Sequence, residues 1–184
     1  MQGPLDQWLG YRDCLPLRIE PLSSEPSAAQ IERWHDQNLR TLHAVCVLDE
    51  RHQRADVTGK SLEDEVERLH QKLDVVLELL GTVLRASRPP APEVPLRLSR
   101  EGLCWTGPDL PPAGAAVLVT LDLHPCAPMP LCWPAQVLGM HEGEVCARFR
   151  EMSDALAAAL ERLVFIRHRR SVAGSRSPGS SHTP

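Results

Sequence analysis

The chain has 184 residues, of which 42% are hydrophobic and 24% charged, a composition that fits one folded domain or two small ones and argues against disorder throughout. Its formal net charge of −4 argues against the electrostatic footprint typical of nucleic-acid-binding domains. Because neither a long uncharged apolar run nor a signal peptide is recognisable, we expect a cytoplasmic protein without a membrane span.

The first predicted elements are a strand and a helix. In residues 15–22 (LPLRIEPL), apolar and polar side chains alternate as in a half-buried strand, and two prolines favour an edge position. Ser27 and Gln30 then form a capping signal, which predicts a helix over about 28–50. The apolar face of this helix consists of Ile31, Trp34, Leu39, Leu42, Val45 and Cys46.

A second helix is predicted over about 61–87, and its apolar residues alternate in steps of four and three. This spacing is the 3.5-residue repeat of a coiled coil. The predicted oligomerisation seam consists of Leu62, Val66, Leu69, Leu73, Val76, Leu80 and Val83. With Leu73 and Leu80 at a positions and Val76 and Val83 at d positions, the pattern favours trimers or tetramers over dimers.

Two interpretations of this helix remain open from the sequence. The seam can bind other copies of the chain, or its wide apolar stripe can pack on the first helix in an intramolecular hairpin. The first interpretation is favoured, and the two are compatible if the first helix packs outside a central bundle of second helices.

The rest of the chain is predicted to form strands and one more helix. A proline-rich spacer follows Arg88 and ends the helical block. Short apolar runs separated by turn residues then predict five strands of a small barrel or curved sheet, at about 94–98, 102–106, 115–123, 131–140 and 143–149. Ser153 and Asp154 cap a last amphipathic helix. The tail at 171–184 is rich in serine, glycine and proline and is expected to be disordered.

No catalytic or metal site is predicted. Gly59, Lys60 and Ser61 lack the preceding glycine and strand of a phosphate-binding loop, and no nucleophile motif occurs. The zinc candidates His124, Cys126, Cys132 and His141 lack the short paired spacing of zinc ligands. The six cysteines, likewise without a C-x-x-C pair, are expected to be mostly buried free thiols. We therefore expect a protein that is not an enzyme.

Residues 97–103 (RLSREGL), the closing pattern of Gly143, Val145 and Phe149, and the last helix together resemble the PilZ domain family of bacterial receptors for cyclic di-GMP. The resemblance implies an α+β fold, a small six-stranded antiparallel β-barrel with a C-terminal helix. Residues 94–170 would form most of the barrel and the helix, and 1–22 an N-terminal extension and the first strand. Residues 23–93 would be a two-helix insertion that forms the coiled coil.

The ligand motif of the family is incomplete here. Its second motif reads (Asp or Asn)-x-Ser-x-x-Gly, and Ser99 and Gly102 match it, whereas Arg97 replaces the acidic or amide residue. The Arg-x-x-x-Arg motif of the family is missing before the first strand. The candidate ligand residues are Arg97, Ser99, Arg100 and Gly102, and we expect this degenerate set not to bind cyclic di-GMP. Ser99 and Gly102 would then keep only the shape of a turn.

The resemblance implies an adaptor in cyclic di-GMP-linked control of motility, pili or virulence, with signalling or pilus proteins as partners. Atypical family members with heptad-repeat helices that assemble into tetramers look like the closest type, so a homotetramer is favoured. Two alternatives are kept. The first is a cyclic di-GMP receptor with a rebuilt site. The second is a nucleic-acid-binding oligomer that uses the basic residues Arg167, His168, Arg169, Arg170 and Arg176.

Overall fold

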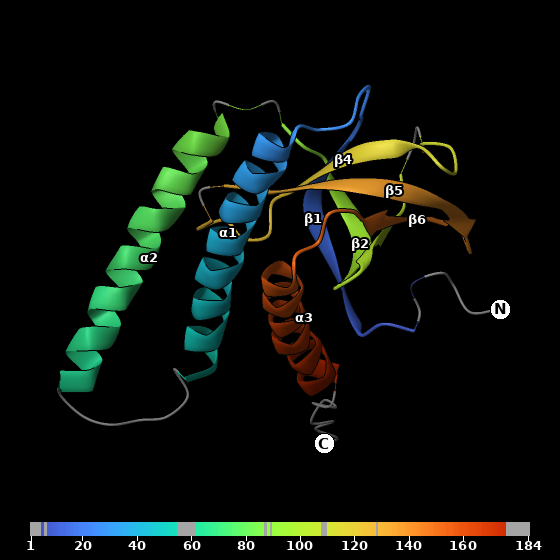
Figure 1. The fold of residues 1–184 in the computed structure, drawn as a ribbon. Coiled ribbons are helices and arrows are strands. Elements are labelled where there is room, and N and C mark those ends of the chain that lie inside the picture. Colours follow the sequence, from blue (N-terminus) through green and yellow to red (C-terminus); the bar gives the residue numbers. More distant parts are fainter. Residues whose placement is uncertain are drawn as a thin grey trace, which may run out of the picture.

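The fold is known from a computed structural model, which describes residues 5, 7–54, 62–86, 88, 90–107, 110–127 and 129–175 (Figure 1). Six strands and three helices follow one another along the chain: β1 (Gly10–Pro21), α1 (Ala28–Arg54), α2 (Leu62–Ala86), β2 (Glu93–Ser99), β3 (Gly102–Trp105), β4 (Ala116–Leu121), β5 (Leu131–His141), β6 (Glu144–Phe149) and α3 (Asp154–Ser175). The predicted α+β fold class is confirmed.

The strands form a closed antiparallel barrel in the order β1-β2-β3-β6-β5-β4. Strand β1 closes it by changing partners: Gly10–Pro16 pairs with β2, and Leu17–Pro21 pairs with β4. The edge position predicted from the two prolines is therefore wrong. Pro16 is tolerated because it lies where β1 exchanges one neighbour for the other.

Helices α1 and α3 pack against each other and against the barrel, α1 beside β5 and α3 beside β1 and β2. Their buried faces, which include Leu42 and Val45 of α1 and Leu160 and Leu163 of α3, join the barrel interior in one core. Asn38 fixes α1 to β5, because its side-chain amide donates to the carbonyl of Cys132 and accepts from the amide of Cys132, both at 2.8 Å.

Helix α2 stands apart from the barrel. Figure 1 shows α1 between α2 and α3, and among the described residues α2 makes no extensive contact with any other element. One contact of α2 with the rest of the chain is a hydrogen bond from the Cys126 thiol to the carbonyl oxygen of Asp74, at 3.6 Å. Within the described helices, no segment is both long and apolar enough to cross a membrane.

Several boundaries and one cysteine pair differ from the sequence predictions. β1 begins five residues before the predicted strand, and α3 continues to Ser175, into the region predicted as tail. The remainder of that tail lies outside the described residues. The prediction of free thiols is wrong for Cys104 and Cys146, which form a disulfide. They are direct cross-strand partners on β3 and β6, a relation that becomes visible only once the register is known.

Candidate functional site

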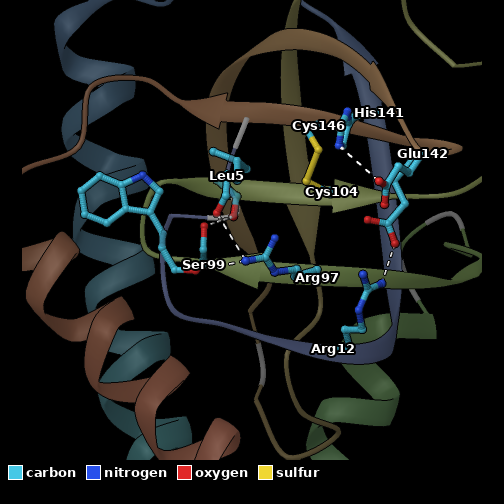
Figure 2. Close-up of a disulfide and its surroundings, with 11 residues drawn as sticks. Leu5, Arg12, Arg97, Ser99, Cys104, His141, Glu142 and Cys146 are labelled. Carbon is cyan, nitrogen blue, oxygen red and sulfur yellow. Dashed lines mark hydrogen bonds and ion pairs between the residues drawn. A yellow bond between two sulfur atoms is a disulfide. The ribbon is translucent and has the colours of Figure 1, made fainter. Parts of the chain in front are cut away.

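The turn between β2 and β3 brings the four candidate ligand residues together (Figure 2). Arg97 lies within β2, Ser99 is its last residue, Arg100 lies in the turn, and Gly102 begins β3. The fragment of the motif seen in the sequence is thus a compact structural unit at one end of the strand pair.

Ser99 and Gly102 serve the turn itself. The Ser99 side chain is 1% exposed, and its hydroxyl donates to the carbonyl oxygen of Gly102 at 3.0 Å. A Cβ atom on Gly102 would lie 2.1 Å from the carbonyl oxygen of Ala147 on β6, so only glycine allows the two strands to approach this closely. Both positions that match the family motif have a structural role that needs no ligand.

Arg97 holds the N-terminal segment, which we define as Leu5, Gln7 and Trp8. Its guanidinium donates to the carbonyl oxygens of Leu5 at 3.3 Å and of Trp8 at 3.1 Å. Leu5 is 2% exposed and packs with Cys104 and Cys146. The residue that replaces the family's acidic position therefore binds the chain's own backbone.

Arg100 is engaged on three sides. Its guanidinium lies 3.2 Å from a carboxylate oxygen of Glu101 and 3.3 Å from one of Glu161 on α3, and it sits 4.9 Å above the ring of Trp8. Such exposed ion pairs are individually weak, but together with the cation–π contact they orient the side chain toward α3 and the N-terminal segment.

Three further arginines, Arg12, Arg18 and Arg88, do not complete a phosphate site with this turn. Arg12 pairs with Glu144 at 2.5 Å, and Arg18 donates to the carbonyl of Pro90. Both lie on β1, where six residues span about 20 Å. Arg88 lies 3.8 Å from Asp122. Each of these guanidinium groups has a partner within the chain.

A buried charge cluster that the sequence did not reveal joins α1, β1 and α3. Arg167 donates to Asp49 at 2.9 Å, to the Tyr11 hydroxyl at 3.1 Å and to the carbonyl of Leu123 at 2.9 Å. Arg170 adds a second bond to Asp49, at 3.1 Å. The pairing satisfies charges that would be costly to bury alone. Desolvation by burial raises the pKa of Tyr11 to about 12.

The basic side chains at the end of α3 make contacts within the chain. Beyond Arg167 and Arg170, a ring nitrogen of His168 lies 3.2 Å from the carbonyl of Gly10, and Arg169 sits 5.7 Å above the ring of Phe165. Arg176, the fifth basic residue of the cluster, lies outside the described part of the chain. The arrangement accounts for these side chains without nucleic acid.

The predicted seam of α2 is exposed. Its members with described side chains are between 45% and 69% exposed: Val66, Leu69, Leu73, Val76, Leu80 and Val83. The side chain of Leu62 lies outside the described set. The hairpin interpretation, in which the seam packs on α1, is therefore wrong for these six residues. Leu77, Leu79 and Leu84 widen the exposed apolar surface.

An apolar cavity of the barrel does not suit a charged ligand, and the residues weighed above as zinc ligands do not form a metal site. A cavity of about 640 Å³ at one end of the barrel is mostly apolar, with Trp105 and Val94 in its wall and Arg18 as the charged residue there. Within the described residues, no group of three histidine, cysteine or acidic side chains could hold a metal ion.

Comparisons with known proteins place these observations in a family. A family model described as "Atypical PilZ domain, cyclic di-GMP receptor" matches residues 39–177. This range is wider than the 94–170 expected from the motif, because it includes all of α2 and part of α1. No curated protein matches the sequence.

Among solved structures, the chain is similar to a pathogenic protein from Xanthomonas campestris, described as a tetrameric PilZ domain self-assembled through an unusual helical bundle. The two sequences are 27% identical, and the match covers 90% of this chain and 91% of that chain with a TM-score of 0.61.

The close approach at Gly102 generates a stability prediction. Gly102→Ala should lower the free energy of unfolding by at least about 2 kcal/mol, because the new methyl group overlaps the Ala147 carbonyl. Gly107→Ala is the matched control, since a Cβ there meets no atom within 4 Å. Urea unfolding followed by circular dichroism measures both. Equal stability of the two variants would contradict the structural role of Gly102.

The Tyr11 cluster generates a pH prediction. The chain has a single tyrosine, so the near-ultraviolet absorbance of tyrosinate reports Tyr11 alone and should show a pKa of about 12 in the folded protein. Unfolded tyrosine loses its proton near pH 10, so the free energy of unfolding should fall between pH 10 and 12, by up to about 1.4 kcal/mol per pH unit. Below pH 10 this group contributes no pH dependence. Tyr11→Phe should remove this share of the fall, and an ordinary pKa near 10 in the folded state would contradict the burial.

Proposed function

The chain belongs to the atypical PilZ domain family, and on this premise we propose that it is a non-enzymatic cytoplasmic adaptor that self-assembles through α2 and does not itself bind cyclic di-GMP. The observation that carries the proposal is the exposed seam of α2.

Self-assembly is supported by the cost of leaving the seam in water. Fully burying a leucine or valine side chain contributes about 1.5–3 kcal/mol, so half-exposed side chains in this row each leave about 1 kcal/mol unrealised in one chain. A contiguous exposed apolar patch on a soluble protein is typical of an interaction surface. The period of the row fits a second helix of the same kind, since each heptad presents the same two positions.

A homotetramer is the state we propose. The order of leucine and valine at the a and d positions favours more than two helices. The Xanthomonas campestris protein is described as a tetramer built through a helical bundle, and this chain covers 91% of it. Leu77, Leu79 and Leu84 widen the apolar stripe beyond the a and d positions, which suits a bundle in which each helix contacts two neighbours.

Loss of cyclic di-GMP binding is supported by the β2–β3 turn. A guanine edge needs an acceptor at the position of Arg97, which offers only donors. The hydroxyl of Ser99 is used within the turn, and the guanidinium of Arg97 is used by the carbonyls of Leu5 and Trp8. A ligand would have to displace the N-terminal segment and break these bonds.

The adaptor role follows from display of several barrels on one bundle. Linked copies raise the effective concentration of each barrel for a multivalent partner without any new contact. We expect the partners among signalling, motility or pilus proteins of bacterial cyclic di-GMP pathways, which is the setting that the family resemblance implies. The function itself rests on the site and the surface, since fold alone does not determine it.

Acidic substitutions in the seam test the assembly. Leu73→Asp with Leu80→Asp would place unpaired charges in the interface, so we expect the mass measured by light scattering to fall from that of a tetramer to that of a monomer. Val75→Asp is the matched control, because Val75 is 55% exposed on the same helix but lies outside the a and d positions. An unchanged mass of the double variant would refute assembly through this seam.

Calorimetric titration with cyclic di-GMP tests the lost site. We expect no binding heat at micromolar ligand and no rise in Tm, because a ligand stabilises the folded state only if it binds it. Micromolar binding that Arg97→Ala and Arg100→Ala abolish would instead establish a receptor with a rebuilt site. Circular dichroism of the two variants controls for loss of fold.

A further inference from the structure

The disulfide between Cys104 and Cys146 joins strands that are already paired. The two residues are register partners on β3 and β6, within a ladder that runs from Gly102 to Trp105 (Figure 2). Backbone hydrogen bonds hold these strands together on both sides of the pair, so closure of the barrel does not depend on the sulfur bond. In a protein of the cytoplasm, where we expect this chain, stable structural disulfides are rare and redox-active ones are the usual kind.

The disulfide borders a small cavity with polar walls. The cavity has a volume of about 110 Å³ and is lined by Leu5, Arg12, Cys104, His141, Glu142, Glu144 and Cys146. Arg12 is paired with Glu144 at 2.5 Å, and His141 lies 3.8 Å from Glu142. The cavity thus places charged side chains of both signs beside the sulfur pair, a polar setting in which a small thiol or disulfide can be bound.

The N-terminal segment rests on the two sulfur-bearing residues. Leu5 forms a separate apolar cluster with Cys104 and Cys146, and Trp8 and Leu138 pack against it. The same segment is held by Arg97 through the carbonyls of Leu5 and Trp8, and by the cation–π contact of Arg100 with the Trp8 ring. Reduction or oxidation of the sulfur atoms therefore alters the surface against which Leu5 packs.

We propose that Cys104 and Cys146 form a reversible thiol–disulfide exchange site for low-molecular-weight thiols and disulfides of the glutathione type, and that its oxidation state controls whether the N-terminal segment stays docked. The proposal does not depend on the chain binding cyclic di-GMP or on its assembly through α2.

The exchange proceeds in two balanced steps. A thiolate of the reductant attacks one cysteine sulfur, the sulfur–sulfur bond breaks, and the other cysteine leaves as a thiolate that takes up a proton. A second thiol of the reductant then attacks the mixed disulfide and releases the first cysteine, which is protonated in turn. Two electrons pass to the protein, and the two reductant thiols leave as their disulfide. Oxidation is the reverse, with the small disulfide as electron acceptor.

Reduction changes the packing beneath Leu5 for a geometric reason. Two unbonded sulfur atoms need a separation of about 3.5–4 Å, against about 2 Å in a disulfide. Protein interiors are too tightly packed to absorb this expansion without movement of a neighbour. Leu5 is the neighbour on the cavity side, and it is tied to the barrel by its apolar contacts and by the hydrogen bond from Arg97 to its carbonyl oxygen, while a second bond from Arg97 holds the carbonyl of Trp8. Its segment is therefore expected to undock while the β3–β6 ladder remains.

The test compares full-length protein equilibrated with oxidised or with reduced glutathione. Brief chymotrypsin treatment and mass spectrometry of the N-terminal fragment measure cleavage after Trp8 and Leu9, which requires local opening of the segment. We expect cleavage about fivefold faster in the reduced protein. The double variant Cys104→Ala, Cys146→Ala has no sulfur pair to oxidise or reduce, so it should be cleaved at the same rate in both buffers. Cys14→Ala, which removes the exposed free thiol, should respond as the wild type does.

Four results would overturn the proposal. The first is a disulfide that does not form with oxidised glutathione or does not open with reduced glutathione in the folded protein. The second is equal cleavage of the two states. The third is loss of the far-ultraviolet circular dichroism of the barrel on reduction, which would make the disulfide a structural crosslink. Loss of the response in Cys14→Ala would likewise assign it to the wrong thiol.

Discussion

The barrel depends on one strand that has two successive partners. β1 pairs with β2 through its first half and with β4 through its second half. Without β1, the facing edges of β2 and β4 would have no strand partner. Because β1 comes first in the chain and β2 follows only after the helices, none of the described residues between Pro21 and Glu93 lies in a strand. The fold tolerates a long insertion at this point, since closure needs only that the chain return to the same edge of β1. Helices α1 and α2 form this insertion.

The two inserted helices differ in how far one chain buries their apolar faces. α1 buries Leu42 and Val45 against α3 and the barrel, and Asn38 fixes it to the backbone of β5. α2 lies outside α1 in Figure 1, where no further layer of the described chain covers its seam. One chain therefore provides a complete core for the barrel and α1 but none for α2. This asymmetry is the reason why the proposed assembly is assigned to α2 and not to α1.

Features that depend on local periodicity were predictable from the sequence, and features that depend on register were not. The heptad row from Val66 to Val83 and all six strands follow from spacing within one segment, although β1 begins earlier than predicted. The Cys104–Cys146 pair requires the alignment of β3 with β6, and the cluster of Asp49 with Arg167 requires the packing of α1 on α3. The edge assignment from the prolines of β1 was wrong because it treated the strand as having one set of neighbours. For the candidate site, the sequence located the turn and its degenerate motif. It could not show that the Arg97 guanidinium is hydrogen-bonded to the backbone of the N-terminal segment.

The turn between β2 and β3 explains why a ligand motif can lose its chemistry and keep its shape. Ser99 and Gly102 satisfy a hydrogen bond and a close strand contact that the barrel needs in any case. Arg97 is under no such constraint, and at its position a donor in place of an acceptor makes the backbone of Leu5 and Trp8 a suitable partner. The segment that it binds packs on the neighbouring sulfur pair. Under the two proposals made above, the residue that replaces the ligand-binding acceptor is therefore also the residue that holds the redox-sensitive segment. Because this turn touches α3 through Glu161 and the seam lies on α2 beyond α1, the two surfaces can be altered independently.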